Sequence, residues 1–245
     1  MMILAEIFKT TLDELVNEGT LQEKTAQPVL YQSETIYDID RNMHFDMHLG
    51  SAKKIVLTSG EDEKLHVKLE SETLPDLHTL FKIKLDEKKK KLDVDCVKKK
   101  GMSRYEIEDA VVISILLPAG YTEHCELEAS ARELEMTGLQ MERLEYDGDA
   151  GVIRVNNCRG CMEFTAKTDY ELFVDRIDGR IDVNQWRARS VIHVRNVEDY
   201  RVTNKGRHSK VYYRKNGEMC EAPVMDGSNE ICISGIGSEL ILELE

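Results

Sequence analysis

Apolar and polar residues alternate along most of the chain from residue 31 onward, which is the pattern of β-strands that bury one face. The apolar positions of the early strands are Met43, Phe45, Met47, Leu49, Ile55, Leu57, Leu65, Val67, Leu69, Phe81, Ile83, Leu85, Leu92, Val94 and Cys96. The stretch FKIKLDEKKKKLDVDC predicts a β-hairpin with Lys88–Lys91 at its tip. We therefore predict an all-β fold.

Two interleaved series of apolar–other–apolar triplets follow. The first is Leu127-Glu128-Ala129, Leu144-Glu145-Tyr146, Met162-Glu163-Phe164, Ile181-Asp182-Val183 and Tyr200-Arg201-Val202, with steps of 17, 18, 19 and 19 residues. The second is Leu134-Glu135-Met136, Ile153-Arg154-Val155, Leu172-Phe173-Val174, Ile192-His193-Val194 and Val211-Tyr212-Tyr213, with steps of 19, 19, 20 and 19 residues. One common period in both series indicates a structural repeat.

The repeat unit is strand–turn–strand–turn, because Gly, Asp and Asn residues separate the triplets. Such a unit cannot bury its apolar face alone, so copies must stack. The pattern predicts a single-stranded β-helix or β-solenoid with coils of about 19 residues. A sandwich of ordinary hairpins is the alternative, although it does not require a constant period.

The ends of the chain differ from the repeats. Leu4, Phe8, Leu12 and Leu15 predict a short N-terminal amphipathic helix over residues 2–18, closed by Gly19. This helix would cap the sheet or bind a partner. We expect an N-terminal helix and connector at 1–30, an irregular β-strand part of the same domain at 31–120, and regular solenoid repeats with closing strands at 121–245.

An outward-facing acidic ladder is the main candidate binding site. The middle residue of each first-series triplet points away from the core, and equivalent residues of stacked coils lie about 4.8 Å apart. The ladder would contain Glu128, Glu145, Glu163 and Asp182. Like charges opposite one another cost stability, so we expect Arg143 and Arg180 to relieve them, with Arg201 at the end of the column. The ladder is either a cation or partner site, or a solvated face that prevents aggregation.

Two further clusters suggest metal or thiol chemistry. His44, Asp46 and His48 alternate with Phe45 and Met47, so the three polar side chains share one face of a strand, where zinc is chemically allowed. Cys158 and Cys161 form a CxxC motif, but no second CxxC exists. We therefore interpret these cysteines as packing residues in a turn between strands rather than as a zinc or redox site.

Composition restricts the class of partner. The 245 residues carry a net charge of −13, which excludes broad binding of nucleic acid, since that requires a basic face. The positive charge is concentrated in Lys88–Lys91 and Lys98–Lys100. We interpret these two clusters as solvated turns, and a contact with phosphate or anionic lipid is the alternative. No stretch reaches the length of a membrane span, and Glu6 and Lys9 interrupt any signal-like core. The sequence as written predicts a cytoplasmic protein with reduced cysteines, or a cell-surface protein if a leader has been removed.

No phosphate-binding loop, dinucleotide fingerprint or GxSxG motif is present in the sequence, so we expect no cofactor. The similar acids of the ladder lack the two different environments that acid–base catalysis requires. We therefore expect a protein that is not an enzyme.

The stretch ISILLPAGY, the short acidic strands and the closing NEICISGIGSELILELE together resemble the bacterial "putative adhesin" β-strand repeat family, related to auto-transporter adhesin head domains. The resemblance covers roughly residues 35–245. It implies a β-helix-like domain of unknown function without established catalytic residues. We expect a non-catalytic binding or scaffold protein with a protein or glycan partner, able to self-associate through the solenoid end or the N-terminal helix. The alternatives are a surface adhesin or carbohydrate-binding domain and a β-helical carbohydrate-active enzyme.

Overall fold

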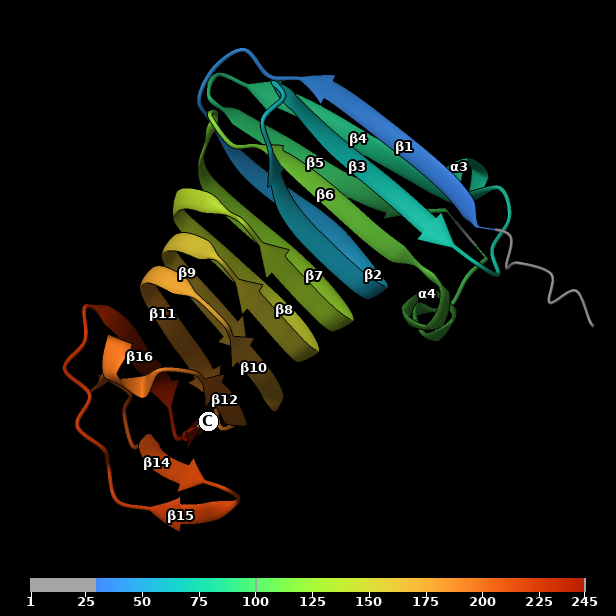
Figure 1. The fold of residues 1–245 in the computed structure, drawn as a ribbon. Coiled ribbons are helices and arrows are strands. Elements are labelled where there is room, and N and C mark those ends of the chain that lie inside the picture. The colour runs from blue at the N-terminus through green and yellow to red at the C-terminus, as the bar shows by residue number, and fades with distance from the viewer. Residues whose placement is uncertain (1–29, 100, 245) are drawn as a thin grey trace, which may run out of the picture.

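The computed structural model describes residues 30–99 and 101–244, which form an all-β protein with three short helical segments (Figure 1). The all-β class predicted from the alternating pattern is confirmed. The helix predicted over residues 2–18 lies outside the described residues.

Three long strands, β2 (Met43–Gly60), β7 (Thr122–Thr137) and β8 (Gln140–Asn156), each contribute one half to each of two parallel ladders. The first ladder runs from β5 (Lys91–Lys98) through the first halves of β2, β7 and β8 to β9 (Cys158–Ala166), β11 (Ile177–Trp186), β16 (Asn229–Ile236) and β13 (Tyr200–Asn204). The second ladder runs from β6 (Val112–Pro118) through the second halves to β10 (Tyr170–Val174), β12 (Arg189–Val194), β17 (Glu239–Leu244) and β14 (Lys210–Lys215).

Antiparallel strands extend both ladders, so the sheet is mixed and does not close on itself. Strand β4 (Phe81–Lys88) pairs with β5, β3 (Lys64–Ser71) pairs with β6, β1 (Tyr31–Asp38) pairs with β3, and β15 (Glu218–Cys220) pairs with β14. Lys88 and Lys91 are directly paired, which confirms the predicted hairpin.

The helical segments are short. They are α3 (Leu77–Leu80), α4 (Arg104–Ala110) and η1 (Val197–Asp199). Helix α4 begins with a capping box, in which the Ser103 hydroxyl accepts from the Glu106 backbone N–H and the Glu106 carboxylate accepts from the Ser103 backbone N–H. Within residues 30–99 and 101–244, no helix has the length and apolar character needed to cross a membrane.

The inward-facing side chains of both ladders form one hydrophobic core, in which Phe45, Tyr146 and Phe164 are almost fully buried. The chain passes from one ladder to the other at a column of small residues, where Gly50 pairs with Ala129 and Ala129 pairs with Gly148. The strands approach closely here, because a Cβ atom on Gly148 would lie 1.8 Å from the carbonyl oxygen of Ala129. Small residues therefore allow each long strand to serve both ladders.

The order of strands at the C-terminal end differs from the order expected from the repeat. We expected the Tyr200 triplet to follow Ile181 and the Val211 triplet to follow Ile192. Instead, β16 lies between β11 and β13, and β17 lies between β12 and β14. Ile181 pairs with Ile231, and Ile192 pairs with Leu242. The closing strands β16 and β17 are as apolar as the repeat strands, so they can occupy the positions beside β11 and β12. They take these positions in place of β13 and β14, which come earlier in the sequence.

Candidate functional sites on the outer faces of the ladders

An acidic column runs across the outer face of the first ladder, but its register differs from the prediction. Glu145 pairs with Glu163, and Glu163 pairs with Asp182, as expected. The position opposite Glu145 on β7 is Glu126, while Glu128 pairs with Asp147 and His48. The prediction was therefore wrong for Glu128 by two residues. A shift of two leaves the same side chains facing outward, so the hydrophobic pattern does not reveal it.

Arginine side chains neutralise much of this column. Arg143 lies 2.5 Å from the Glu145 carboxylate and 2.8 Å from that of Glu163. Arg180 Nη2 lies 2.6 Å from Asp182, and this hydrogen bond raises the pKa of Arg180. The expected relief of like charges by these arginines is present. The face is therefore a strip of alternating charges rather than an uncompensated acidic surface.

Strand β2 places His44, Asp46 and His48 on the same outer face, but these residues do not form one site. Residues four apart on a strand are separated by about 13 Å, too far for His44 and His48 to bind one ion. Asp46 forms an ion pair with Lys91 and lies 3.3 Å from His48 Nε2. His48 Nδ1 also lies 3.1 Å from Glu128.

His44 instead joins two residues of the neighbouring strand. Its ring stacks on that of His124 with 4.4 Å between centroids and 7° between planes. Together with Glu126, these residues place three possible metal-ligand atoms within 4.8 Å of one another. His124 and Glu126 were not predicted, because their position beside His44 depends on strand pairing.

The cysteines of the CxxC motif are strand residues of β9, and the turn that separates β9 from β8 lies at Asn157, with a φ of 51°, directly before the motif rather than within it. Cys158 is buried and donates weakly to the backbone oxygens of Met136 and Asn156. Burial raises the pKa of both Cys158 and Cys161, so the reactive thiolate is disfavoured. This environment favours the packing interpretation.

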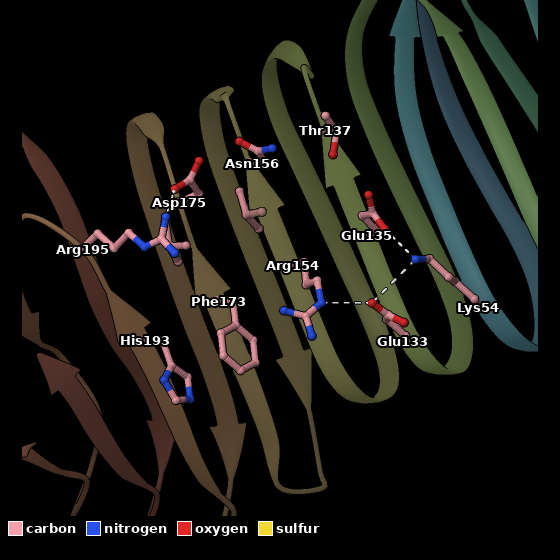
Figure 2. A pocket seen from close by; sticks show the side chains of 12 residues that line it. Lys54, Glu133, Glu135, Thr137, Arg154, Asn156, Phe173, Asp175, His193 and Arg195 are labelled. Carbon is pink, nitrogen blue, oxygen red and sulfur yellow. Dashed lines mark hydrogen bonds and ion pairs between the residues drawn. The ribbon is translucent and has the colours of Figure 1, made fainter. Parts of the chain in front are cut away.

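A shallow hollow of about 520 Å³ lies on the outer face of the second ladder (Figure 2). Its centre is a stack of side chains from three successive strands. The guanidinium carbon of Arg154 lies 4.6 Å from the centroid of the Phe173 ring, and the Phe173 and His193 rings stack with 4.1 Å between centroids. Strand pairing produces this stack, since Arg154 and His193 are both partners of Phe173.

Ion pairs surround the stack on both sides. Lys54 Nζ lies 2.6 Å from Glu135 and 3.6 Å from Glu133, and Arg154 Nε donates to Glu133 at 3.0 Å (Figure 2). The hydrogen bond to Glu135 raises the pKa of Lys54. These pairs place positive and negative groups next to one another along this side of the hollow.

On the far side of the hollow, Arg195 Nη1 donates to Asp175 at 2.9 Å. The lining residues thus include three cations, Lys54, Arg154 and Arg195, and three carboxylates, Glu133, Glu135 and Asp175. With neutral histidine, the formal charge of the hollow is therefore zero, although the whole chain carries −13.

The sequence contained a signal for the centre of this hollow. Arg154, Phe173 and His193 are the middle residues of three second-series triplets. The middle residue of each triplet faces away from the core, so these three side chains are expected on the same outer face. The second series keeps the predicted pairing here: Ile153 pairs with Leu172, and Leu172 with Ile192. We did not predict a site there because these residues share no single chemistry.

No protein-family model and no curated protein matches the sequence. Among solved structures, the chain is similar to a "putative cell adhesion protein" from Clostridium sporogenes, with 11% identity, 89% of this chain and 100% of that chain covered, and a TM-score of 0.42. It is also similar to a "putative adhesin" from Bacteroides fragilis, with 12% identity, 88% and 99% coverage, and a TM-score of 0.43. A "putative lipid binding protein" from Parabacteroides distasonis shares 11% identity over 86% of this chain and 96% of that chain, with a TM-score of 0.34. Likenesses at these levels do not assign a function.

Proposed function

We propose that this protein is a non-catalytic binding protein that holds a neutral oligosaccharide on the outer face of the second ladder. The hollow around Phe173 and His193 is the proposed site. The observation that supports this ligand class is the balance of three cations and three carboxylates around an aromatic stack. Hydroxyl groups can donate to the carboxylates and accept from the arginines and the lysine, and a neutral ligand brings no charge that must be compensated.

The arrangement of strands supports a chain-like ligand. Successive parallel strands repeat about every 4.8 Å, and the hollow takes side chains from β2, β7, β8, β10 and β12. We infer that the ladders are the stacked coils of a β-solenoid with about 19 residues per coil, as in the "putative adhesin" repeat family that the sequence resembles. A solenoid offers an extended surface on which several sugar units can lie. A surface adhesin is the form of this proposal in which the oligosaccharide belongs to a cell surface.

The environment of the acids supports binding rather than hydrolysis. Glycoside hydrolysis requires two carboxyl groups in different environments, one kept protonated and one ionised. Glu133 and Glu135 both contact Lys54, and Glu133 also contacts Arg154, so neither acid lies in the apolar surroundings that keep a catalytic acid protonated. We therefore propose that the bound oligosaccharide is released intact.

A glycan array followed by isothermal titration calorimetry with the best oligosaccharide tests the proposal. Arg154→Ala should weaken binding at least about tenfold, since it removes both the cation over Phe173 and the partner of Glu133. Arg180→Ala is the matched control, because this arginine also pairs with an acid but lies on the other ladder. Equal loss in both variants, no array signal, or cleavage of the oligosaccharide during incubation would each overturn the proposal.

A further inference from the structure

We propose that His44, His124 and Glu126 form a binding site for a zinc-like divalent transition-metal ion, completed by Glu145. The site lies on the outer face of the first ladder and is separate from the oligosaccharide hollow. Two imidazoles and carboxylate oxygens are ligands that zinc accepts, whereas calcium prefers oxygen ligands alone. The donor set therefore identifies the class of ion.

The distances between possible ligand atoms suit a small ion. Metal–ligand bonds of about 2.0–2.2 Å in a tetrahedron separate the ligand atoms by about 3.3 Å. His44 Nε2 lies 3.2 Å from Glu126 Oε1, and His124 Nε2 lies 3.3 Å from Glu145 Oε1. The two imidazole rings stack in parallel, so the rings must reorient for the lone pairs of both nitrogens to meet at one ion.

The two ring nitrogens lack hydrogen-bond partners. Nε2 of His44 and Nε2 of His124 are both shielded from solvent and make no hydrogen bond. The carboxylate oxygens nearby are close enough, so the contacts fail in direction and not in distance. Buried polar atoms are normally paired, and a metal ion would satisfy both nitrogens at once.

A β-bulge creates the cluster. Met43 pairs with Thr122, but the next residue, His44, pairs with His124, so Glu123 is an extra residue on β7. Bulges redirect side chains and are frequent beside functional sites. Without the extra residue, His124 would not lie opposite His44.

The surrounding charges accommodate a divalent cation. Lys91 of β5 is the other neighbour of His44, and Arg143 of β8 is the other neighbour of His124. Both cations are already paired, Lys91 with Asp46 and Asp93 and Arg143 with Glu145 and Glu163. Lys91 and Arg143 stand against five carboxylates, those of Asp46, Asp93, Glu126, Glu145 and Glu163, so the formal charge of these groups is −3 and a divalent cation offsets part of it.

Titration of the chelator-treated full chain with zinc chloride, followed by calorimetry, tests the site, and cobalt(II) absorption reports its geometry. We expect one equivalent to bind with a tetrahedral cobalt spectrum. His124→Phe keeps a stacked ring but removes the ligand, and it should weaken zinc binding at least about tenfold, since loss of even an outer-shell partner costs about 10–100-fold. Glu126→Gln should also weaken binding.

His48→Ala is the matched control, because His48 lies on the same strand face but outside the cluster, and its zinc affinity should equal that of the unmodified chain. Cys161→Ser is a second control, which tests whether a cysteine thiol binds the zinc. This variant should bind zinc with the affinity of the unmodified chain. The proposal is overturned if the unmodified chain takes up neither zinc nor cobalt, if His124→Phe binds as tightly as the control, or if calcium binds at the cluster in preference to zinc.

Discussion

Phe164 and Val183 are direct partners on the neighbouring parallel strands β9 and β11, and both side chains are fully buried. Phe164 also contacts the ring of Tyr146, with 6.4 Å between centroids and 59° between planes. The side chain thus links three successive strands of the first ladder. Its pairing with Val183 is the one that the first series of triplets predicts.

Replacing Phe164 with alanine should lower the free energy of unfolding by about 3–5 kcal/mol, because it removes a buried ring and leaves a cavity. Urea denaturation monitored by circular dichroism measures this change. Thr165→Ala, at the adjacent outward position, should change the free energy of unfolding by no more than about 0.5 kcal/mol. A comparably small loss for Phe164→Ala would contradict the buried position.

Replacing Gly148 with alanine should also destabilise the fold, by roughly 1–3 kcal/mol. The added Cβ would lie 1.8 Å from the Ala129 carbonyl oxygen, so the two long strands must separate. Gly120→Ala is the control, because no atom lies within 4 Å of its Cβ position. Thermal melts of both variants make the comparison, and equal melting temperatures would show that the close approach is absent.

Stability should fall at alkaline pH in a way that depends on Cys125. Burial raises the pKa of this thiol from 9.0 to about 12. A folded-state pKa above the unfolded-state value means that the stabilisation is fully present below pH 9 and is lost as the pH rises toward 12. In that window each such group changes the free energy of unfolding by about 1.4 kcal/mol per pH unit.

Urea denaturation at a series of pH values between about 8 and 11 measures this slope. Cys125→Ala leaves a smaller core side chain and lowers stability at every pH, but its slope should be shallower because one titrating group is gone. Cys220→Ala is the control, since Cys220 is exposed. Parallel slopes for the unmodified chain and Cys125→Ala would contradict the prediction.

His66 should titrate above its ordinary pKa of 6.5. The hydrogen bond to Glu34 on the neighbouring strand is the largest cause of the raised pKa, and Asp62 adds to it. Because the folded-state pKa is raised, the stabilisation is complete below 6.5 and disappears as the pH passes the folded-state value. An NMR titration of the imidazole protons measures the pKa directly.

Glu34→Gln should lower the pKa of His66 toward 6.5, and it should destabilise the protein more at acidic than at alkaline pH. Asp38→Asn is the matched control, because Asp38 lies on the same strand but pairs with Lys64. If Glu34→Gln leaves the His66 titration unchanged, the hydrogen bond is not the cause of the shift.

The candidate sites were only partly predictable from the sequence. Some of their residues are placed by the local period of the strands, and others only by strand pairing in the tertiary structure. Glu145, Glu163 and Asp182 share a column as predicted, since the local period carries them into register. His124 was not predictable, because a bulge places it beside His44. The outward position of Arg154, Phe173 and His193 follows from the alternating pattern in the same way as that of the acids. Their stacking was not predicted, because an arginine, a phenylalanine and a histidine share no single chemistry.

The sequence by itself determined that this protein is built of strands and which side of these strands is buried. Alternation specifies these features locally, because each side chain must face either the core or water. Only the tertiary structure decided which strands are neighbours. A shift of two residues preserves every buried face, so Glu126 takes the place expected for Glu128 without changing the pattern. The insertion of β16 and β17 between earlier strands joins residues about 50 positions apart, and no local pattern encodes a contact at that separation.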